Sequence, residues 1–275
     1  MWSPLPLSPP TTKRSIGATQ RSSPRLPRLQ TEMTKLNVTW AADRAAMAKL
    51  AANHVSAALL DGSVTSLALP TGDTPIGMYE ELSQRCQRGE ISFGDTTLFN
   101  LDEYVGMSPD NPRSYHAFMR RHLIDRIDAP EDQVNLLRGD ASDADEECRA
   151  FDRAIAAAGG IDLAVLGLGA NGHIAFNEPG VAWDLDTHVV ALDERTRQAH
   201  RPNFPDEVSV PSTGVTMGIN TLRSARKVLL LCAGESKREA MAALLSGRED
   251  PAWPVTSLLG HSDLVIVAEE ALMPS

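Results

Sequence analysis

IDLAVLGLGANGHIAFNEPG, residues 161–180, joins a short apolar run to a glycine-rich loop that carries a histidine and a glutamate. The apolar run, residues 161–166, predicts a buried strand. Similar runs predict strands at 64–69, 96–100, 227–232 and 264–267, and helical patterns predict helices at 41–60, 75–88, 113–127, 143–157, 214–224 and 235–245. Apolar strands alternating with helices are typical of a parallel sheet covered on both faces. We therefore predict an α/β fold: a doubly wound, mostly parallel, Rossmann-like sheet with helices on both faces.

Two parts of the chain differ in composition. Residues 1–35 are rich in Pro, Arg and Ser and show no apolar periodicity, which predicts a disordered extension. This extension either has no role in the fold or directs the chain to an organelle, as its arginines and serines would suit. Residues 36–275 contain neither an internal repeat nor a linker, so we expect them to form a single domain.

Charge and cysteine content exclude several classes of protein. The 275 residues include 36 acidic and 26 basic side chains, a net charge of −10, so nucleic acid is not expected as a partner. No apolar run approaches the ~18 residues that would span a membrane. The three cysteines form no spaced pair, so we expect neither a metal cluster nor a disulfide framework, and a reducing cytoplasm fits best.

Two segments could hold an anion, because ligands of such sheets lie beyond the carboxyl ends of the strands. Thr71, Gly72, Asp73 and Thr74 follow the strand at 64–69, where backbone N–H groups at a helix start could hold a phosphate. An ordinary strand-to-helix turn with Thr74 as N-cap is the alternative. Lys237 follows another strand and is either a second phosphate contact or a surface residue.

Acidic and imidazole side chains follow two other strands. Asp102 and Glu103 are adjacent, so on an extended chain they point to opposite faces. We expect one to enter the cleft as a general base and the other to anchor the structure, and a solvated pair is the alternative. His173 and Glu178 lie in the glycine-rich loop, where a carboxylate could orient or charge the imidazole.

The same loop matches a dinucleotide-binding pattern, G-x-G-x-x-G, at Gly167, Gly169 and Gly172. Pro179 and Gly180 stop any long crossover helix there, so a nicotinamide cofactor is not expected. Asp162 precedes its strand as a turn residue. The remaining histidines have no comparable setting: His54, His116, His122, His188, His200 and His261.

Three blocks together resemble the glucosamine-6-phosphate deaminase family, within the superfamily that includes 6-phosphogluconolactonases. They are LPTGDTP at 69–75, FNLDEYVG at 99–106 with SYHAFM at 114–119, and GHIAFNEP at 172–179. The resemblance implies conversion of glucosamine 6-phosphate to fructose 6-phosphate and ammonia by a hydrolase/isomerase of amino sugar catabolism, without cofactor or metal. It implies ring opening by His173 with Glu178 in support, proton transfer from C2 to C1 by Asp102, and phosphate binding by the 71–74 loop and Lys237. The partner is then a small sugar phosphate, and a homo-oligomer is compatible with it.

The chain departs from the family pattern at three positions. Asn171 stands where many members carry an aspartate, and an amide can hydrogen-bond there without relaying a proton. Asp73 adds an acid to the phosphate loop and must turn outward or meet a cation. Arg201 is the candidate for the family's phosphate-binding arginine, with an alignment that allows a shift of one residue.

Three other functions stay open at this point. A deaminase for galactosamine 6-phosphate and a 6-phosphogluconolactonase are the nearest alternatives. A non-catalytic sugar-phosphate sensor is the alternative from another class of protein.

Overall fold

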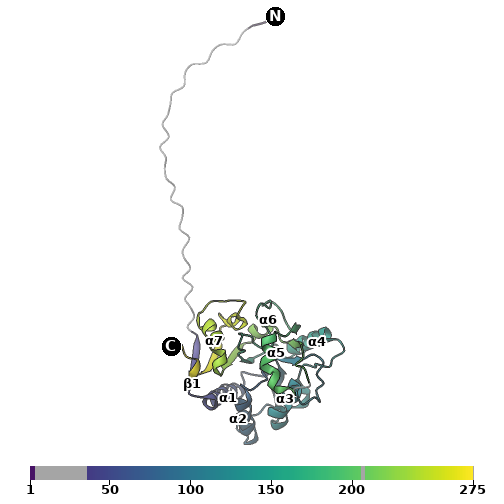
Figure 1. Ribbon diagram of the computed structural model, residues 1–275, viewed down its shortest axis with the longest axis vertical. Helices are drawn as coiled ribbons and strands as arrows, with labels where there is room; N and C mark the ends of the chain where they lie inside the picture. The colour runs from purple at the N-terminus through teal and green to yellow at the C-terminus, as the bar shows by residue number, and fades with distance from the viewer. Residues whose placement is uncertain (4–35, 206–207, 275) are drawn as a thin grey trace. The chain divides into compact units, whose positions relative to one another are not determined.

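A parallel sheet of seven strands forms the centre of the computed structural model, which describes residues 1–3, 36–205 and 208–274 (Figure 1). The strand order is β1-β10-β9-β6-β2-β3-β5, and every pairing is parallel. The strands are β1 (Asn37–Ala41), β2 (Ser66–Leu69), β3 (Thr97–Asn100), β5 (Val134–Asn135), β6 (Leu163–Gly167), β9 (Lys227–Cys232) and β10 (Leu264–Glu269). The predicted doubly wound α/β fold is confirmed.

Helices cover both faces of this sheet. On one face α1 (Arg44–Leu60), α2 (Ile76–Gln87) and α3 (Tyr115–His122) contribute to one buried cluster. On the other face α4 (Ala144–Ala157), α6 (Ile219–Arg223) and α7 (Arg238–Leu245) contribute to a second cluster. Successive strand residues alternate between the clusters, as the pleat requires: Leu67 and Leu69 pack on the first and Ala68 on the second.

A second sheet was not predicted from the sequence. It contains β4 (Asp102–Tyr104), β8 (Thr213–Thr216) and β7 (His188–Ala191) in the order β4-β8-β7, and both pairings are antiparallel. The helix predicted at 214–224 is therefore wrong over its first residues, and only Ile219–Arg223 is helical. The β-branched residues of TGVT suit a strand that pairs on both edges.

Strand β1 was also not predicted from the sequence. It pairs with β10 at the edge of the large sheet. The predicted helix at 41–60 therefore begins three residues later, after Asp43, whose side chain accepts a hydrogen bond from the Ala46 N–H. Asp162 does more than occupy a turn. Its carboxylate accepts hydrogen bonds from the Thr65 and Ser66 N–H groups, and it pairs with Arg226.

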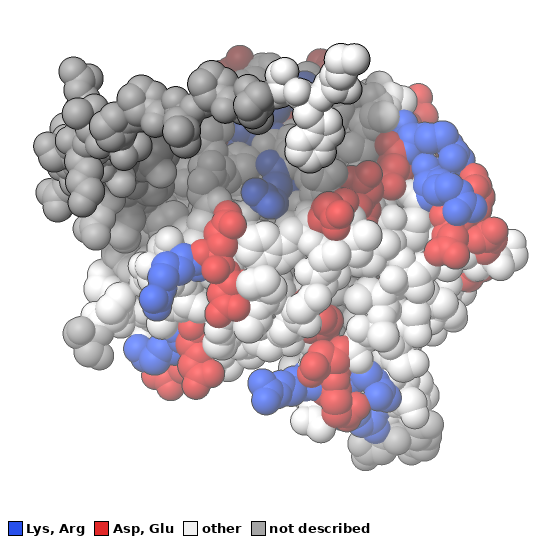
Figure 2. Space-filling model, turned by 90° about the horizontal axis from the view of Figure 1, so that it is seen from above, with Lys and Arg blue, Asp and Glu red and all other residues white. Residues whose placement is uncertain are grey.

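Residues 34–275 form one compact unit. Most of the predicted extension, residues 4–35, lies outside the described residues. No helix within the described ranges is long and apolar enough to cross a membrane. Figure 2 shows one face of the molecule, on which acidic and basic side chains stand in adjacent groups rather than in a continuous patch of one sign.

Candidate active site

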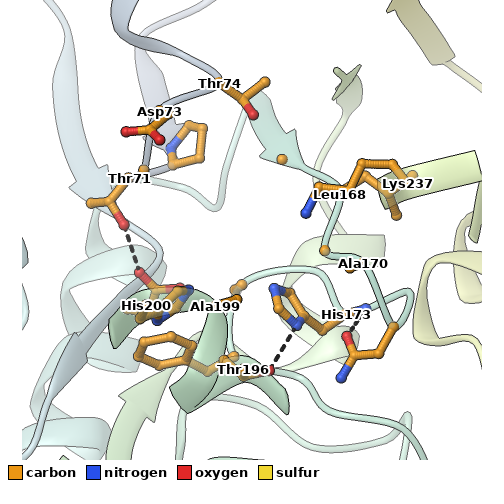
Figure 3. Close-up of a pocket in the computed structure, with 18 of the residues that line it drawn as sticks. Thr71, Asp73, Thr74, Leu168, Ala170, His173, Thr196, Ala199, His200 and Lys237 are labelled. Carbon is orange, nitrogen blue, oxygen red and sulfur yellow. Dashed lines mark hydrogen bonds between the residues drawn. The ribbon is translucent and has the colours of Figure 1, made fainter. Parts of the chain in front are cut away.

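A cavity of about 1170 Å³ lies at the carboxyl ends of the central strands. Its walls include the segments that directly follow strands β2, β3, β6 and β9: residues 70–74, 101–102, 168–171 and 233–237. This is the edge at which ligands bind in doubly wound sheets. The sequence-predicted segments thus meet in one place, as Figure 3 shows for Thr71, His173 and Lys237.

Asp102 is the buried carboxyl group of this cavity. Only 5% of the residue is exposed, and Thr71 Oγ1 donates a hydrogen bond to its Oδ1 at 3.4 Å (Figure 3). Burial, with a smaller contribution from the nearby Glu103, raises the pKa of Asp102 to about 8, and the Thr71 hydrogen bond opposes the shift. A carboxyl group with a pKa near neutrality can exchange a proton with a substrate carbon at moderate pH.

Glu103 points away from the cavity and anchors the start of helix α3. Its carboxylate accepts hydrogen bonds from the backbone N–H groups of Tyr104 (2.8 Å), Tyr115 (3.1 Å) and His116 (2.8 Å). Burial raises the pKa of Glu103 to about 7, although these N–H groups oppose the shift. The prediction that the adjacent carboxylates take opposite sides, one in the cleft and one structural, is confirmed.

His173 lines the cavity, and Glu178 lies behind it. His173 Nδ1 is 3.6 Å from Glu178 Oε2 and 3.3 Å from Thr196 Oγ1 (Figure 3). Asn171 Nδ2 donates to Glu178 Oε2 at 2.8 Å, and Asn171 Oδ1 accepts from the His173 N–H at 3.2 Å. Burial acts to raise the pKa of Glu178, but contacts with His173, Thr196 and Asn171 outweigh it and keep this pKa below its usual value. Glu178 therefore stays ionised beside the imidazole.

Two glycines give this loop its shape. Gly172 has a φ of +83°, a backbone conformation that other residues rarely adopt, and a Cβ there would meet the Trp253 ring. A Cβ on Gly169 would clash with the His173 imidazole. Within the G-x-G-x-x-G pattern, Gly169 therefore makes room for His173 and Gly172 makes room for Trp253.

The predicted phosphate loop forms one wall of the cavity. Thr71, Gly72, Asp73 and Thr74 all line it. In Figure 3 Thr71, Asp73 and Thr74 lie across the cavity from Lys237. Helix α2 has no side-chain cap hydrogen bond, so Thr74 does not act as its N-cap. Burial lowers the pKa of Lys237, and the charge of the nearby Arg44 lowers it further.

Arg201 is not brought to the cavity with the other predicted residues. It lies in a 3-10 turn after α5 (Glu194–His200), and its Nη1 donates hydrogen bonds to the carbonyl oxygens of Pro205 (2.9 Å) and Val208 (2.6 Å). Other cations line the cavity in its place, among them Arg44, Arg121 and Arg195. These arginines lie on helices rather than directly after strands, so the positions of the apolar runs did not point to them.

His200 is a further residue of the cavity that the sequence did not single out. It is the last residue of α5, and its Nδ1 lies 2.7 Å from the Tyr104 hydroxyl. The expectation that His200 has no setting comparable to that of His173 is therefore wrong, because both line the same cavity. The described part of the chain contains no group of three or more His, Cys, Asp or Glu side chains that could hold a metal ion.

Comparison with known proteins identifies the family. A family model described as glucosamine-6-phosphate isomerases/6-phosphogluconolactonase matches residues 41–266. The glucosamine-6-phosphate deaminase of Thermoanaerobacter sp. (strain X514) is 42% identical over 224 residues, which are 82% of this chain and 88% of that protein. The glucosamine-6-phosphate deaminase of Clostridium acetobutylicum is 39% identical over 225 residues, which are 82% of this chain and 93% of that protein.

Solved structures agree with the sequence comparison. The structure of a monomeric glucosamine-6-phosphate deaminase superimposes with a TM-score of 0.84 at 37% identity, covering 86% of this chain and 98% of that one. A 6-phosphogluconolactonase from Thermotoga maritima, 20% identical with a TM-score of 0.69 and covering 86% of this chain and all of that one, shares the fold. This chain belongs to the family of glucosamine-6-phosphate isomerases and 6-phosphogluconolactonases, on its glucosamine-6-phosphate deaminase branch.

Proposed function

We propose that the protein converts glucosamine 6-phosphate and water to fructose 6-phosphate and ammonia, as an isomerase/deaminase rather than a simple hydrolase. One observation carries this proposal: the buried Asp102 lies in the same cavity as His173, and Glu178 contacts the imidazole of His173. An isomerisation needs a base that removes a proton from carbon, whereas hydrolysis of a lactone needs only an activated water. Relatives named glucosamine-6-phosphate deaminase, about 40% identical, support the same conclusion.

Ring opening is the first step, and His173 performs it. The pyranose must lose the proton of its C1 hydroxyl and gain one on the ring oxygen, which gives the open-chain aldehyde. An imidazole can carry this proton, since its ring nitrogen can accept a proton and then donate it. Glu178 and Thr196 hold its Nδ1 side, which leaves Nε2 for the sugar. Asn171 contributes by orienting Glu178 and does not itself carry a proton.

Asp102 then moves a proton between two carbons. Its ionised carboxylate takes the proton from C2, and the electron pair of that bond forms the C1–C2 double bond. The electron pair of the C1 carbonyl moves to O1, which takes a proton from the ammonium group on C2, so that the intermediate is an enolamine. The same carboxyl group returns the proton to C1, which leaves an imine at C2. Water adds to this imine, and ammonia leaves to give the ketone of fructose 6-phosphate.

The substrate phosphate is held by the 71–74 loop and Lys237. Small residues and hydroxyls surround it on one side and an ammonium on the other. Binding this remote group positions C2 over Asp102, so that a weak base can act on a weakly acidic proton. Asp73 must keep its carboxylate away from the dianion, and it lies across the cavity from Lys237 in Figure 3.

The proposal is tested by measuring ammonia release from glucosamine 6-phosphate, with galactosamine 6-phosphate and 6-phosphogluconolactone in parallel. We expect ammonia and fructose 6-phosphate in equal amounts from the first substrate, and slower turnover of the other two. Hydrolysis of the lactone without ammonia release from either amino sugar would refute the proposal, and binding without turnover of any would indicate a sensor.

The setting of this activity is also a proposal. We place it in the cytoplasm, in amino sugar catabolism, because its three cysteines, Cys86, Cys148 and Cys232, are all free. The ligand is a small sugar phosphate rather than a nucleic acid or a membrane surface. Light scattering of the purified protein would show whether it forms a homo-oligomer.

A further inference from the structure

One side of the His200 ring is held inside the protein. Nδ1 lies 2.7 Å from the Tyr104 hydroxyl, which in turn lies 3.1 Å from the Tyr115 hydroxyl. The rings of Tyr104 and Phe176 flank the imidazole, each with its centroid 6.1 Å away. Hydrogen bonding and ring contacts therefore fix the orientation of His200 before any substrate binds.

The other ring nitrogen is unused. Nε2 has no hydrogen-bond partner within the described part of the chain, and His200 is one of the residues that line the cavity. Because the Tyr104 hydroxyl already occupies Nδ1, Nε2 is the ring nitrogen left for a ligand in the cavity. A polar atom at the wall of a cavity, with its ring fixed, is suited to hydrogen-bond a ligand.

The charge of His200 decides which part of a sugar phosphate it suits. Burial, with smaller contributions from the nearby His173 and Lys237, lowers the pKa of His200 to about 4, and the carboxylates of Glu178 and Asp73 oppose the shift. The imidazole is therefore neutral at pH 7. A neutral imidazole cannot neutralise a phosphate, but it can form a hydrogen bond with a sugar hydroxyl.

The position of His200 narrows the choice of hydroxyl. In Figure 3 its ring lies on the side of Thr71, with the phosphate loop above it and His173 beside it. In the binding mode of the proposed function, C2 of the sugar lies at Asp102, and the phosphate on C6 lies between the 71–74 loop and Lys237. The hydroxyls between these two ends are those on C3 and C4.

We propose that His200 Nε2 hydrogen-bonds the C3 or C4 hydroxyl of the substrate and so determines which amino sugar phosphate the cavity accepts. This inference rests on the proposed function, because it takes the placement of C2 and C6 from it. His200 is a specificity-determining residue in this account and takes no part in proton transfer to carbon.

A double-mutant cycle tests the proposal, with one change in the protein and one in the sugar. His200→Phe removes both nitrogens and keeps a planar ring, and His200→Gln keeps a donor and an acceptor of similar reach. Each variant and the parent protein are assayed with glucosamine 6-phosphate and with its 3-deoxy and 4-deoxy analogues. Circular dichroism and thermal unfolding check that the variants are folded.

We expect His200→Phe to lose about 10-fold in kcat/KM with glucosamine 6-phosphate, the effect of one hydrogen bond. With the deoxy sugar that lacks the contacted hydroxyl, the parent protein should lose the same factor and the variant nothing more. His200→Gln should recover part of the loss with glucosamine 6-phosphate.

Independent losses from the two changes on both deoxy sugars would overturn the proposal, because a merely structural histidine shows no such coupling. If the parent protein releases no ammonia, the proposed function fails by itself. The same cycle is then measured as binding of the three sugars by calorimetry, and independent losses there overturn the role of His200.

Discussion

Asp102→Asn should have opposite effects on activity and on stability. The amide keeps the shape of the side chain and its contact with Thr71, but it cannot take a proton from C2. Loss of a general base typically costs on the order of 10²- to 10⁴-fold in rate. Sugar-phosphate binding should persist, because the 71–74 loop and Lys237 are unchanged.

The stability effect follows from the pKa of Asp102. Its ordinary pKa of 3.8 is raised to about 8 in the folded protein, so the folded state favours the protonated carboxyl group. The stability associated with that group is therefore complete below about pH 4 and is lost as the pH rises to about 8. The loss is about 1.4 kcal/mol per pH unit, which sums to about 4 kcal/mol at pH 7. The Asp102→Asn variant has no such loss, although burying the new amide costs part of the gain.

Chemical denaturation of both proteins between pH 5 and pH 8 measures this effect directly. We expect the variant to be more stable at pH 7, with a difference in the free energy of unfolding that grows with pH. Ammonia release under the same conditions should fall by at least 100-fold. A difference in stability that does not change with pH would show that Asp102 keeps its ordinary pKa, and full activity would remove it from the mechanism.

Four other variants test the roles of single charged residues. Glu103→Ala should lower the free energy of unfolding by about 1–3 kcal/mol, since it leaves backbone N–H groups at the start of α3 without their acceptor; an unchanged melting temperature would contradict this anchoring role. Glu178→Gln should lower kcat about 10-fold or more with little change in KM, because Glu178 contacts His173 and lies outside the lining of the cavity; a rise in KM alone would place it against the substrate. Lys237→Met should raise KM by about 10- to 100-fold, whereas Arg201→Ala should change it less than about twofold; the reverse order would assign the phosphate to Arg201.

The local pattern of the sequence was enough to predict five of the seven strands of the large sheet and most of its helices. Strand β9 is found where its apolar run predicted it. Almost all of its side chains are buried, which is the environment that such a run favours. The small sheet could not be predicted in this way. TGVT at 213–216 becomes a strand through its pairing with β4 and β7, which are more than a hundred and more than twenty residues away in the chain.

The candidate site was predictable where a side chain directly follows a strand. Asp102, His173 and Lys237 come together for this reason, since the carboxyl ends of parallel strands share one edge. His200 and Arg44 reach the cavity from the end of α5 and the start of α1, so their place depends on helix packing. Arg201 follows His200 in the chain, but its side chain binds the carbonyl groups of Pro205 and Val208 instead of lining the cavity. No local sequence pattern distinguishes these two neighbouring positions.

Proton transfer by Asp102 from C2 to C1 is the central claim, and turnover of glucosamine 6-phosphate in D₂O tests it most directly. The carboxyl group exchanges its proton with solvent, so the fructose 6-phosphate formed should carry deuterium at C1 on one face, as nuclear magnetic resonance of the product would show. If Asp102 exchanges its proton with solvent faster than it transfers the proton to C1, the product carries nearly one deuterium per molecule. If Asp102 transfers part of the original C2 protons directly, the product carries less deuterium. Product with deuterium distributed equally between both C1 positions from the first turnover would contradict a single carboxylate acting on one face.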